Sequence, residues 1–413
     1  MTGGERVTYR SVLANREFAA ILFSQALSTA GDQLARIAVA VLVFDRTDSG
    51  LLASATYAVS YLTYLVGGPF LSALSDRYPR LTVMVACDLL RVPFVLVMCV
   101  HAPPLWLLFS CLVLLGLLAP PFDSARSAVQ PEILPGDAYV AGNAIMNIVL
   151  QVGQVVGFVL GGALVALVSV RGALALDAAT FLVSAGVLLV WVLHRPAAQP
   201  SDERSTLLQD TLTGIRFVRA DPALRRYLGL SVVGSAALIT PEGLAVPTAH
   251  ELGGGAFAAG ILTATIPAGF VVSGLLILTA SPQRRLQLLF PLGLLAISPL
   301  VLSPLMPNLA AMTALWTLAG LGACMNLIAS AAYVQSCPSA YRSRAYGVAA
   351  TGLFSAQGVA LLASGALADL TSPAAAVAIF SGAMLVVLLA TPSLRGAAPE
   401  TQGITGLVRS RPG

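Results

Sequence analysis

The first long apolar stretch of the sequence carries a row of polar side chains that could bind and release a proton. Gln25, Asp32 and Arg36 recur at spacings that place them on one helical face, together with Ser28 and Thr29. If the stretch crosses a membrane, an ionisable side chain in it is costly unless it faces water or a partner. Asp32 and Arg36 are four residues apart and can pair. The row is therefore either a structural ion pair or a cavity-facing proton site, and its overall polarity favours the second interpretation.

A second polar row consists of four amide side chains in the apolar stretch 139–168. They fall within an arc of about 80° when successive residues turn by about 100° on a helix. Its members are Asn143, Asn147, Gln151 and Gln154. Four amides cannot all face lipid. They either join helices by hydrogen bonds or line a polar cavity, and both interpretations stay open.

Other charged residues lie inside apolar stretches. Asp88 and Arg91 are three residues apart, which is the spacing of a structural ion pair on one helix. Glu242 directly follows Pro241, and a further proline at position 247 predicts a bent helix there. An acid beside a bend is a candidate for coupling or for a gate.

Composition excludes whole classes of function. The chain has 413 residues, of which 57% are hydrophobic and 10% charged, whereas soluble domains carry roughly 25% charged residues. A soluble enzyme, a nucleic-acid-binding protein and a secreted disulfide scaffold are excluded. The sequence has no lysine, so it has no P-loop for ATP hydrolysis. The 3 histidines are isolated and the 5 cysteines follow no repeated spacing, so we expect no metal and no cofactor.

The elements that must position these residues are membrane-spanning helices of about 20 residues each. The sequence predicts an all-α membrane protein with twelve spans, at roughly 18–44, 50–74, 82–101, 105–122, 139–168, 173–194, 226–249, 256–279, 286–303, 308–334, 344–369 and 374–391. Asp177 and Asp369 lie near the ends of their spans, where we expect them to contact water.

Arginine placement predicts the orientation and the domains. Nineteen arginines fall on the side of both termini and two on the opposite side, which predicts cytoplasmic termini. A polar stretch with an amphipathic helix, 196–225, separates an N-terminal six-helix half, 1–195, from a C-terminal half, 226–395, and a cytoplasmic tail, 396–413. Weak matches at an offset of about 205 residues, such as Gly50 with Gly255, indicate a parallel repeat, which is typical of one large transporter class.

The chain resembles the major facilitator superfamily over nearly its whole length. The most specific part runs from Phe122 to Pro131 and on to Ala144. It is similar to the connection between spans 4 and 5 in the macrolide-efflux and enterobactin-exporter branch of drug:proton antiporters. Asp32 and the Asp88–Arg91 segment fit the same branch.

Two motifs of that superfamily are present in altered form. In the loop between spans 2 and 3, Asp76, Arg77 and Arg80 match the family pattern, while Ser72, Pro79 and Leu81 depart from it. The resemblance implies a cytoplasmic gate in which Asp76 lies near the start of span 11, with Arg342 or Arg344 as its partner.

The second motif is the glycine series of span 5, which goes with export in the family. Gly153, Gly157, Gly161 and Gly162 match it, and Phe158 replaces its proline. Small residues at this spacing let another helix approach closely. The superfamily's usual arginine in span 4 is absent from 105–122, so the proton relay of the best-known drug antiporters is not carried over.

We therefore expect a plasma-membrane secondary transporter that exports an amphipathic small molecule, such as a drug, a siderophore or a secondary metabolite, in exchange for protons. The expected partners are that substrate, protons and the lipid bilayer, with no nucleic acid, and the family implies a monomer. The expected cavity residues are Asp32, Arg36, Gln25, Glu242, Asn143, Asn147 and Gln151. An importer or a uniporter without proton coupling is the alternative, followed by a non-transporting membrane sensor. A membrane enzyme would need a cluster of catalytic side chains that the isolated histidines do not supply.

Overall fold

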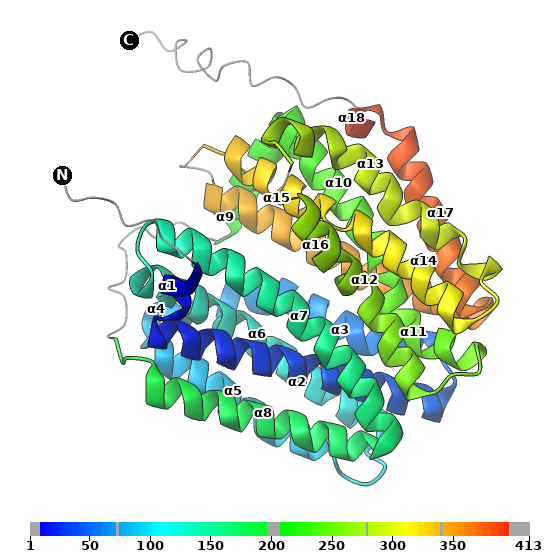
Figure 1. The fold of residues 1–413 in the computed structure, drawn as a ribbon, viewed down its shortest axis with the longest axis horizontal. Helices are drawn as coiled ribbons and strands as arrows, with labels where there is room; N and C mark the ends of the chain where they lie inside the picture. The colour runs from blue at the N-terminus through cyan, green and yellow to red at the C-terminus, as the bar shows by residue number, and fades with distance from the viewer. Residues whose placement is uncertain (1–8, 72–73, 196–206, 278–279, 339–341, 396–413) are drawn as a thin grey trace.

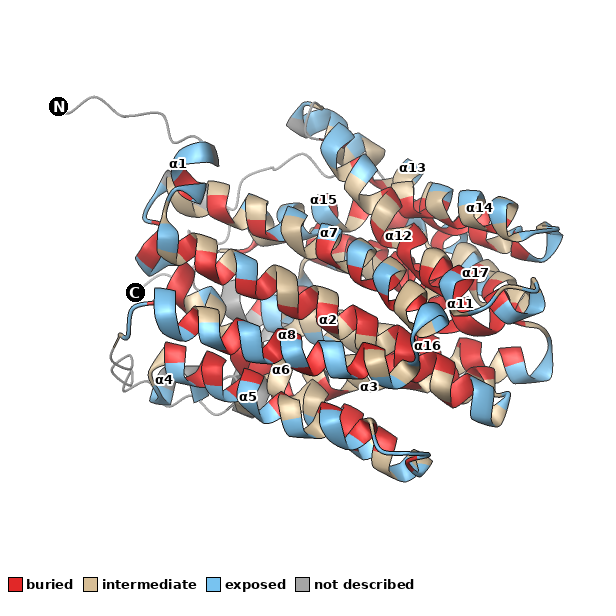
Figure 2. Ribbon diagram, turned by 60° about the horizontal axis from the view of Figure 1, so that its bottom comes forward, coloured by how far each residue is buried: buried red, intermediate tan, exposed pale blue. Residues whose placement is uncertain are grey.

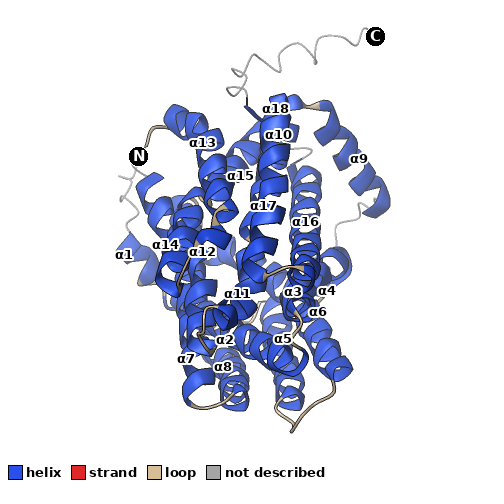
Figure 3. Ribbon diagram, turned by 90° about the vertical axis from the view of Figure 1, so that its right-hand side faces the viewer, coloured by secondary structure: helices blue, strands red, loops and turns tan. Residues whose placement is uncertain are grey.

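The computed structural model describes residues 9–71, 74–195, 207–277, 280–338 and 342–395. Every regular element in those ranges is a helix (Figure 3), which confirms the predicted all-α class.

The helices form two groups joined by α9 (Leu207–Ala220). The first group, called the N-half here, consists of α1 (Tyr9–Leu13), α2 (Arg16–Thr47), α3 (Gly50–Leu71), α4 (Leu74–Arg77), α5 (Arg80–Met98), α6 (Leu105–Ile133), α7 (Asp137–Leu167) and α8 (Val170–Trp191). The second group, called the C-half, consists of α10 (Pro222–Leu238), α11 (Thr240–Glu251), α12 (Ala256–Ile277), α13 (Pro282–Val301), the short 3-10 turn η1 (Ser303–Leu305), α14 (Leu309–Gly322), α15 (Met325–Ser336), α16 (Arg342–Leu370), α17 (Pro373–Ala390) and α18 (Pro392–Arg395). Residues 196–206 and 396–413 of the predicted linker and tail lie outside the described residues.

The described helices agree with a chain that crosses the membrane many times. Eleven helical segments among the described residues are long and apolar enough to span it. The helix α3 is also long enough, with 22 residues, but it carries Tyr57, Tyr61 and Tyr64 and packs between other helices. The predicted boundaries hold to within a few residues, with one clear exception. The span expected to end near 122 continues as α6 to Ile133, so the segment with the family signature is helical.

Two of the membrane-length segments consist of two helices each. The break between α10 and α11 falls at Ile239, beside the bend predicted from Pro241. The break between α14 and α15 was not predicted, because no proline marks it. There the chain passes close to α13: a Cβ on Gly322 would lie 2.6 Å from the Cα of Ala296.

Packing of the two halves defines the two ends of the molecule. We call the end where α2 begins and α8 ends the proximal end, and the end of Ser49 and Asp369 the distal end. The halves meet along α3 with α16 and along α7 with α12 (Figure 1). The apolar core of the C-half includes Ile37, Phe44 and Tyr57 from the distal part of the N-half. The proximal core of the N-half, around Phe18 and Met84, is a separate cluster.

The helix α2 lies at the centre of the N-half and is buried along most of its length (Figure 2). Asn15 caps its first turn, since its side chain accepts hydrogen bonds from the backbone of Glu17 and Phe18, both at 3.1 Å. The packing of α7 and α8 on either side of α2 sets the directions in which its polar row can point.

Candidate functional site

A buried arginine on α5 organises the interior of the N-half. Arg91 and Asp88 lie one turn apart, with 3.6 Å between Nη1 and Oδ1, and their side chains are 5% and 0% exposed. Asp88 also accepts a hydrogen bond of 2.5 Å from Ser184 of α8. The guanidinium lies 5.3 Å from the ring centroid of Phe122 and 5.2 Å from that of Phe181. An arginine held between two rings and a carboxylate has little freedom to move.

The same arginine lines a cavity of about 70 Å³ inside the N-half, which we call the N-half cavity. Asp32 and Arg36 of α2, Tyr64 of α3 and Asp177 of α8 also line it. This places the two ionisable residues of the α2 row on one cavity wall, opposite helices that carry further charges.

Asp177 was expected to contact water, and that prediction is wrong. Asp177 is only 1% exposed. Asp177 approaches α2 because Gly31 has no side chain: a Cβ there would lie 2.5 Å from the Asp177 carboxylate. Thr180, one turn further along α8, donates a hydrogen bond of 2.7 Å to the Asp177 backbone oxygen. Sequence reasoning missed this residue, and the signal that could have found it was an acid and a threonine three residues apart in an apolar span.

Arg36 pairs across the two halves. The structure joins it to Glu242 of α11 at 3.9 Å rather than to Asp32 on its own helix. The two side chains are 26% and 16% exposed. Glu242 reaches α2 because it lies in the first turn of α11, directly after the break at Ile239. The acid beside the bend therefore contacts the α2 row, as a coupling or gating role would require.

The remaining polar residues of the predicted cavity do not line the N-half cavity. Gln25 is 8% exposed and donates a hydrogen bond of 3.2 Å to Thr29 on its own helix. Asn147 is exposed and bonds to the backbone of Asn143 at 2.9 Å. Asn143 and Gln151 are half-buried on α7. Their roles in a cavity stay predictions.

A second cavity of about 150 Å³, the C-half cavity, lies between α10, α15 and α16. Its lining includes Tyr227, Ser231, Asn326, Ser330, Tyr333, Tyr346 and Phe354. Ring contact between the halves bridges the two cavities, because Tyr64 lines one and Phe354 the other, with 4.9 Å between their centroids. The hydroxyl of Tyr64 donates to Asp123 at 2.5 Å, which holds the ring in place.

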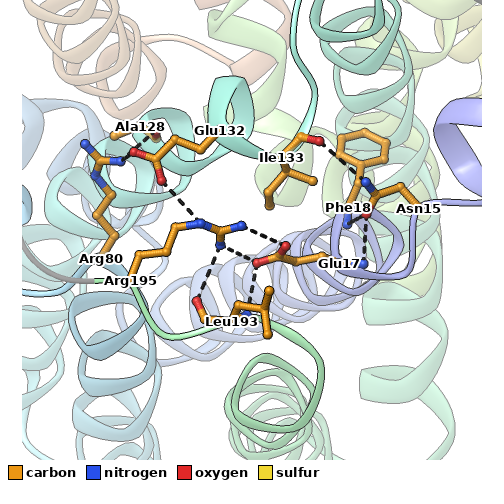
Figure 4. Close-up of polar contacts among 9 residues, drawn as sticks. All are labelled: Asn15, Glu17, Phe18, Arg80, Ala128, Glu132, Ile133, Leu193 and Arg195. Carbon is orange, nitrogen blue, oxygen red and sulfur yellow. Dashed lines mark hydrogen bonds and ion pairs between the residues drawn. The ribbon is translucent and has the colours of Figure 1, made fainter.

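An ion network at the proximal end joins three helices of the N-half, α2, α5 and α6, to the segment after α8 (Figure 4). Arg80 pairs with Glu132, which lies 3.4 Å from Nε of Arg195. Arg195 in turn donates to both carboxylate oxygens of Glu17, one of them at 2.9 Å. The hydrogen bond with Glu17 raises the pKa of the Arg195 guanidinium. The network ties the starts of α2 and α5 to the end of α6 and to the segment that follows α8.

The predicted cytoplasmic gate is only partly visible. Arg80 makes its contacts within the N-half, where it also donates a hydrogen bond of 3.1 Å to the Ala128 backbone oxygen. Arg77 is exposed. The side chains of Asp76, Arg342 and Arg344 lie outside the described residues, so the gate stays a prediction.

The distal end is held by a carboxylate of one half on a helix start of the other. Asp369 of α16, an exposed residue as expected, accepts hydrogen bonds from the first residues of α3. The donors are the Ser49 hydroxyl at 2.8 Å, the Gly50 N–H at 2.5 Å and the Leu51 N–H at 3.3 Å. A helix start carries free N–H groups and a partial positive charge, which a carboxylate satisfies.

The glycine series of α7 faces two different helices. Cβ atoms on Gly157 and Gly161 would lie 2.6 Å from the Ala30 backbone oxygen and 2.8 Å from the Leu34 Cα, both on α2, and Gly153 faces the same helix. Gly162 instead faces α12 of the C-half, where a Cβ would lie 2.6 Å from the backbone oxygen of Ala256. The series thus brings α7 close to its own half and, at the distal end, to the other half.

Comparison with known proteins decides the family. The model of the Major Facilitator Superfamily matches residues 21–306, which is more than half of the chain. The chain belongs to this superfamily. Membership places it with multi-pass membrane transporters and not with enzymes, as the sequence predicted.

Relatives within the superfamily are distant. The chain is 27% identical over 209 residues to the uncharacterized transporter YfiS of Bacillus subtilis (strain 168), covering 49% of each chain. It is 28% identical over 244 residues to the multidrug efflux pump Tap of Mycolicibacterium fortuitum, covering 55% of this chain and 58% of that protein. It is also 26% identical over 191 residues to the lysophospholipid transporter LplT of Serratia proteamaculans (strain 568), covering 46% of each. The chain spans about half the length of the curated relatives it matches.

Solved structures of superfamily members share the fold. The nucleoside transporter NupG superposes with a TM-score of 0.71 at 13% identity, covering 90% of this chain and 98% of NupG. A POT family transporter in complex with 5-aminolevulinic acid gives 0.70 at 12% identity, covering 92% and 97%. Similarity at this level of identity concerns the fold alone.

Proposed function

We propose that this superfamily member is a secondary transporter of the plasma membrane that exports an amphipathic small molecule in exchange for protons. The protein would work by alternating access, with both termini in the cytoplasm. Within the superfamily, it would be most similar in function to the drug-exporter branch. The similarity to the efflux pump Tap and the export-type glycine series support the direction. The arginine bias supports the orientation, since basic residues gather on the cytoplasmic side.

The balance of acidic and basic side chains in the N-half supports the proposed coupling to protons. Asp88 pairs with Arg91, Asp32 and Asp177 line the same cavity as Arg91, and Arg36 is paired with Glu242. Full ionisation would leave uncompensated negative charge in a low-dielectric interior. A buried carboxylate without a partner is costly and becomes neutral by binding a proton. The cluster therefore holds at least one exchangeable proton.

We assign the exchangeable proton to Asp32, which is half-buried on the cavity wall. Its neighbour Asp88 is fixed by Arg91 and Ser184, which suits a structural ion pair. When Asp32 gains or loses its proton, the balance of charge next to Arg36 changes. The Arg36–Glu242 pair joins the two halves, so this change shifts the equilibrium between their relative orientations.

With cytoplasmic termini, the described conformation is closed on the outside, where Asp369 and Gly162 join the halves. In the opposite conformation the proximal ends would approach each other. We infer that Asp76, Arg77 and Arg80 then act with Arg344 as the cytoplasmic gate that the loop motif implies.

The test is uptake of a panel of amphipathic compounds into inside-out vesicles that contain the full chain. We expect uptake that a proton uncoupler abolishes. Asp32→Asn should lose the pH dependence and keep downhill movement, whereas Glu251→Gln, which removes a carboxylate charge at the distal end, should behave as wild type. Fully pH-coupled uptake by Asp32→Asn would refute the assignment to Asp32. Uptake that ignores the uncoupler would indicate a uniporter, and uptake in right-side-out vesicles alone would indicate an importer.

A further inference from the structure

The C-half cavity has a chemical character opposite to that of the N-half cavity. Its described lining holds the aromatic rings of Tyr227, Tyr333, Tyr346 and Phe354, together with hydroxyl and amide groups, and no ionisable acid or base other than tyrosine. The N-half cavity is lined by two acids and two arginines. The Tyr64–Phe354 ring contact lies between them. The two cavities therefore suit different parts of a ligand.

One residue that lines the C-half cavity has a buried polar atom without a hydrogen-bond partner. Asn326 donates a hydrogen bond of 2.9 Å from Nδ2 to the Ser235 hydroxyl, but its carbonyl Oδ1 is buried and accepts none. The nearby Tyr333 hydroxyl is already used, since it donates to the Ala345 backbone oxygen at 2.8 Å. Buried polar atoms in folded proteins nearly always have a partner, so an unfilled acceptor on a residue beside a cavity indicates a missing donor.

The cavity's size and walls restrict what can supply that donor. About 150 Å³ is less than the roughly 300–1,000 Å³ of sites that hold a whole drug-sized ligand. Aromatic walls favour flat rings, which stack on them or meet them edge-on. An anion would be excluded, because it would lose its hydration and meet no cationic side chain in the described lining.

We propose that the C-half cavity is a substrate subsite for an uncharged, flat ring that donates an N–H or O–H hydrogen bond to Oδ1 of Asn326. The proposal rests on the proposed function, because it divides one substrate between two cavities. The ring enters the C-half cavity, and any charged part of the molecule stays beside Arg36 and Glu242. Asn326 is then a residue that determines specificity for donor-bearing rings.

The test compares two rings of the same size, indole and benzofuran, which differ in having an N–H donor or an oxygen acceptor. Binding is measured by saturation-transfer difference NMR on the purified full chain in nanodiscs, with the signal of empty nanodiscs subtracted. We expect wild type to bind indole about tenfold more tightly than benzofuran, the factor of one neutral hydrogen bond. Asn326→Leu, which keeps the volume and removes the acceptor, should bring the ratio close to one.

Two further variants separate the hydrogen bond from general effects. Phe354→Leu should weaken both rings and leave their ratio unchanged. Glu251→Gln, which removes an exposed charge at the end of α11, should leave both affinities unchanged. Equal binding of the two rings to wild type, no binding of indole, or an unchanged ratio in Asn326→Leu would each overturn the proposal. The measurement uses no proton gradient, so a failure of proton-coupled export would leave its result intact.

Discussion

Removing the Asp369 carboxylate should shift the protein away from the described conformation. The perturbation is Asp369→Ala, with Asp369→Asn as a milder change that keeps one acceptor. In the described state this carboxylate accepts three hydrogen bonds at the start of α3. When the distal ends separate, water would replace it there. The variant therefore destabilises only the distal-closed state.

The size of the shift follows from what a helix cap contributes. Losing a capping side chain costs about 1 kcal/mol, within a range of roughly 0.5–2 kcal/mol. The favourable placement of a negative charge at a helix start adds about 0.3–1 kcal/mol at an exposed site. Asp369 is exposed, so the lower part of these ranges applies. A net loss of about 1–2 kcal/mol for Asp369→Ala corresponds to a shift of roughly 5- to 30-fold in the ratio of the two states, and about 0.5–1 kcal/mol for Asp369→Asn to roughly 2- to 5-fold.

The assay is a distance measurement between spin labels at the distal end. Leu167 at the end of α7 is 84% exposed and Leu305 in the C-half is 71% exposed, so labels there should not disturb packing. Both are replaced by cysteine after the five native cysteines have been removed. We expect the longer distance to gain population in Asp369→Ala, less in Asp369→Asn and not at all in Glu251→Gln. An unchanged distribution in Asp369→Ala, or an equal change in Glu251→Gln, would refute the reasoning.

Three other outcomes follow from the packing of the N-half. Gly162→Val should reduce transport at least tenfold by forcing α7 away from α12, while Gly186→Val, at a glycine with open space around it, should retain transport; equal loss in both would contradict the close-contact argument. Asp88→Ala should lower stability by about 1–3 kcal/mol because it removes the salt-bridge partner of Arg91 and the acceptor of the Ser184 hydroxyl, while Asp32 and Asp177 still balance the guanidinium charge; the double change with Arg91→Met should lower the thermal unfolding midpoint further, because it leaves those carboxylates without a cation. Arg195→Gln should lower the unfolding midpoint by only a few degrees, since the network is partly exposed and such pairs contribute about 1 kcal/mol or less; a collapse of expression would show that the network matters more than its exposure suggests.

Local patterns in the sequence were sufficient to predict the spans. Each span is a run of apolar residues whose length is set by the bilayer, and the boundaries carry charges or prolines that can be read directly. The break at Ile239 followed from Pro241 in the same way. The break before Cys324 did not, because no proline marks it and the close approach of α13 at Gly322 is a contact that no local pattern reports.

Candidate residues were harder to place than spans, because burial and pairing depend on distant segments. The spacing of Asp32 and Arg36 predicted a pair within one helix, yet Glu242 from the other half provides the partner of Arg36. Asp177 was expected at a wet helix end, but its burial depends on the missing side chain of Gly31. A helical face can be deduced from periodicity, whereas the helix that covers this face cannot.

The ion network at the proximal end also determines how mechanical load passes through the protein. Arg195 is the last described residue before the chain continues toward α9. Its guanidinium forms ion pairs with Glu17 at the start of α2 and with Glu132 near the end of α6. A pull on the chain at this point is thus shared by several helices instead of drawing α8 alone out of the bundle. Glu132 passes the load on to Arg80 and hence to α5. The segment that leads toward α9 is therefore anchored to α2 and α6 directly and to α5 through Glu132.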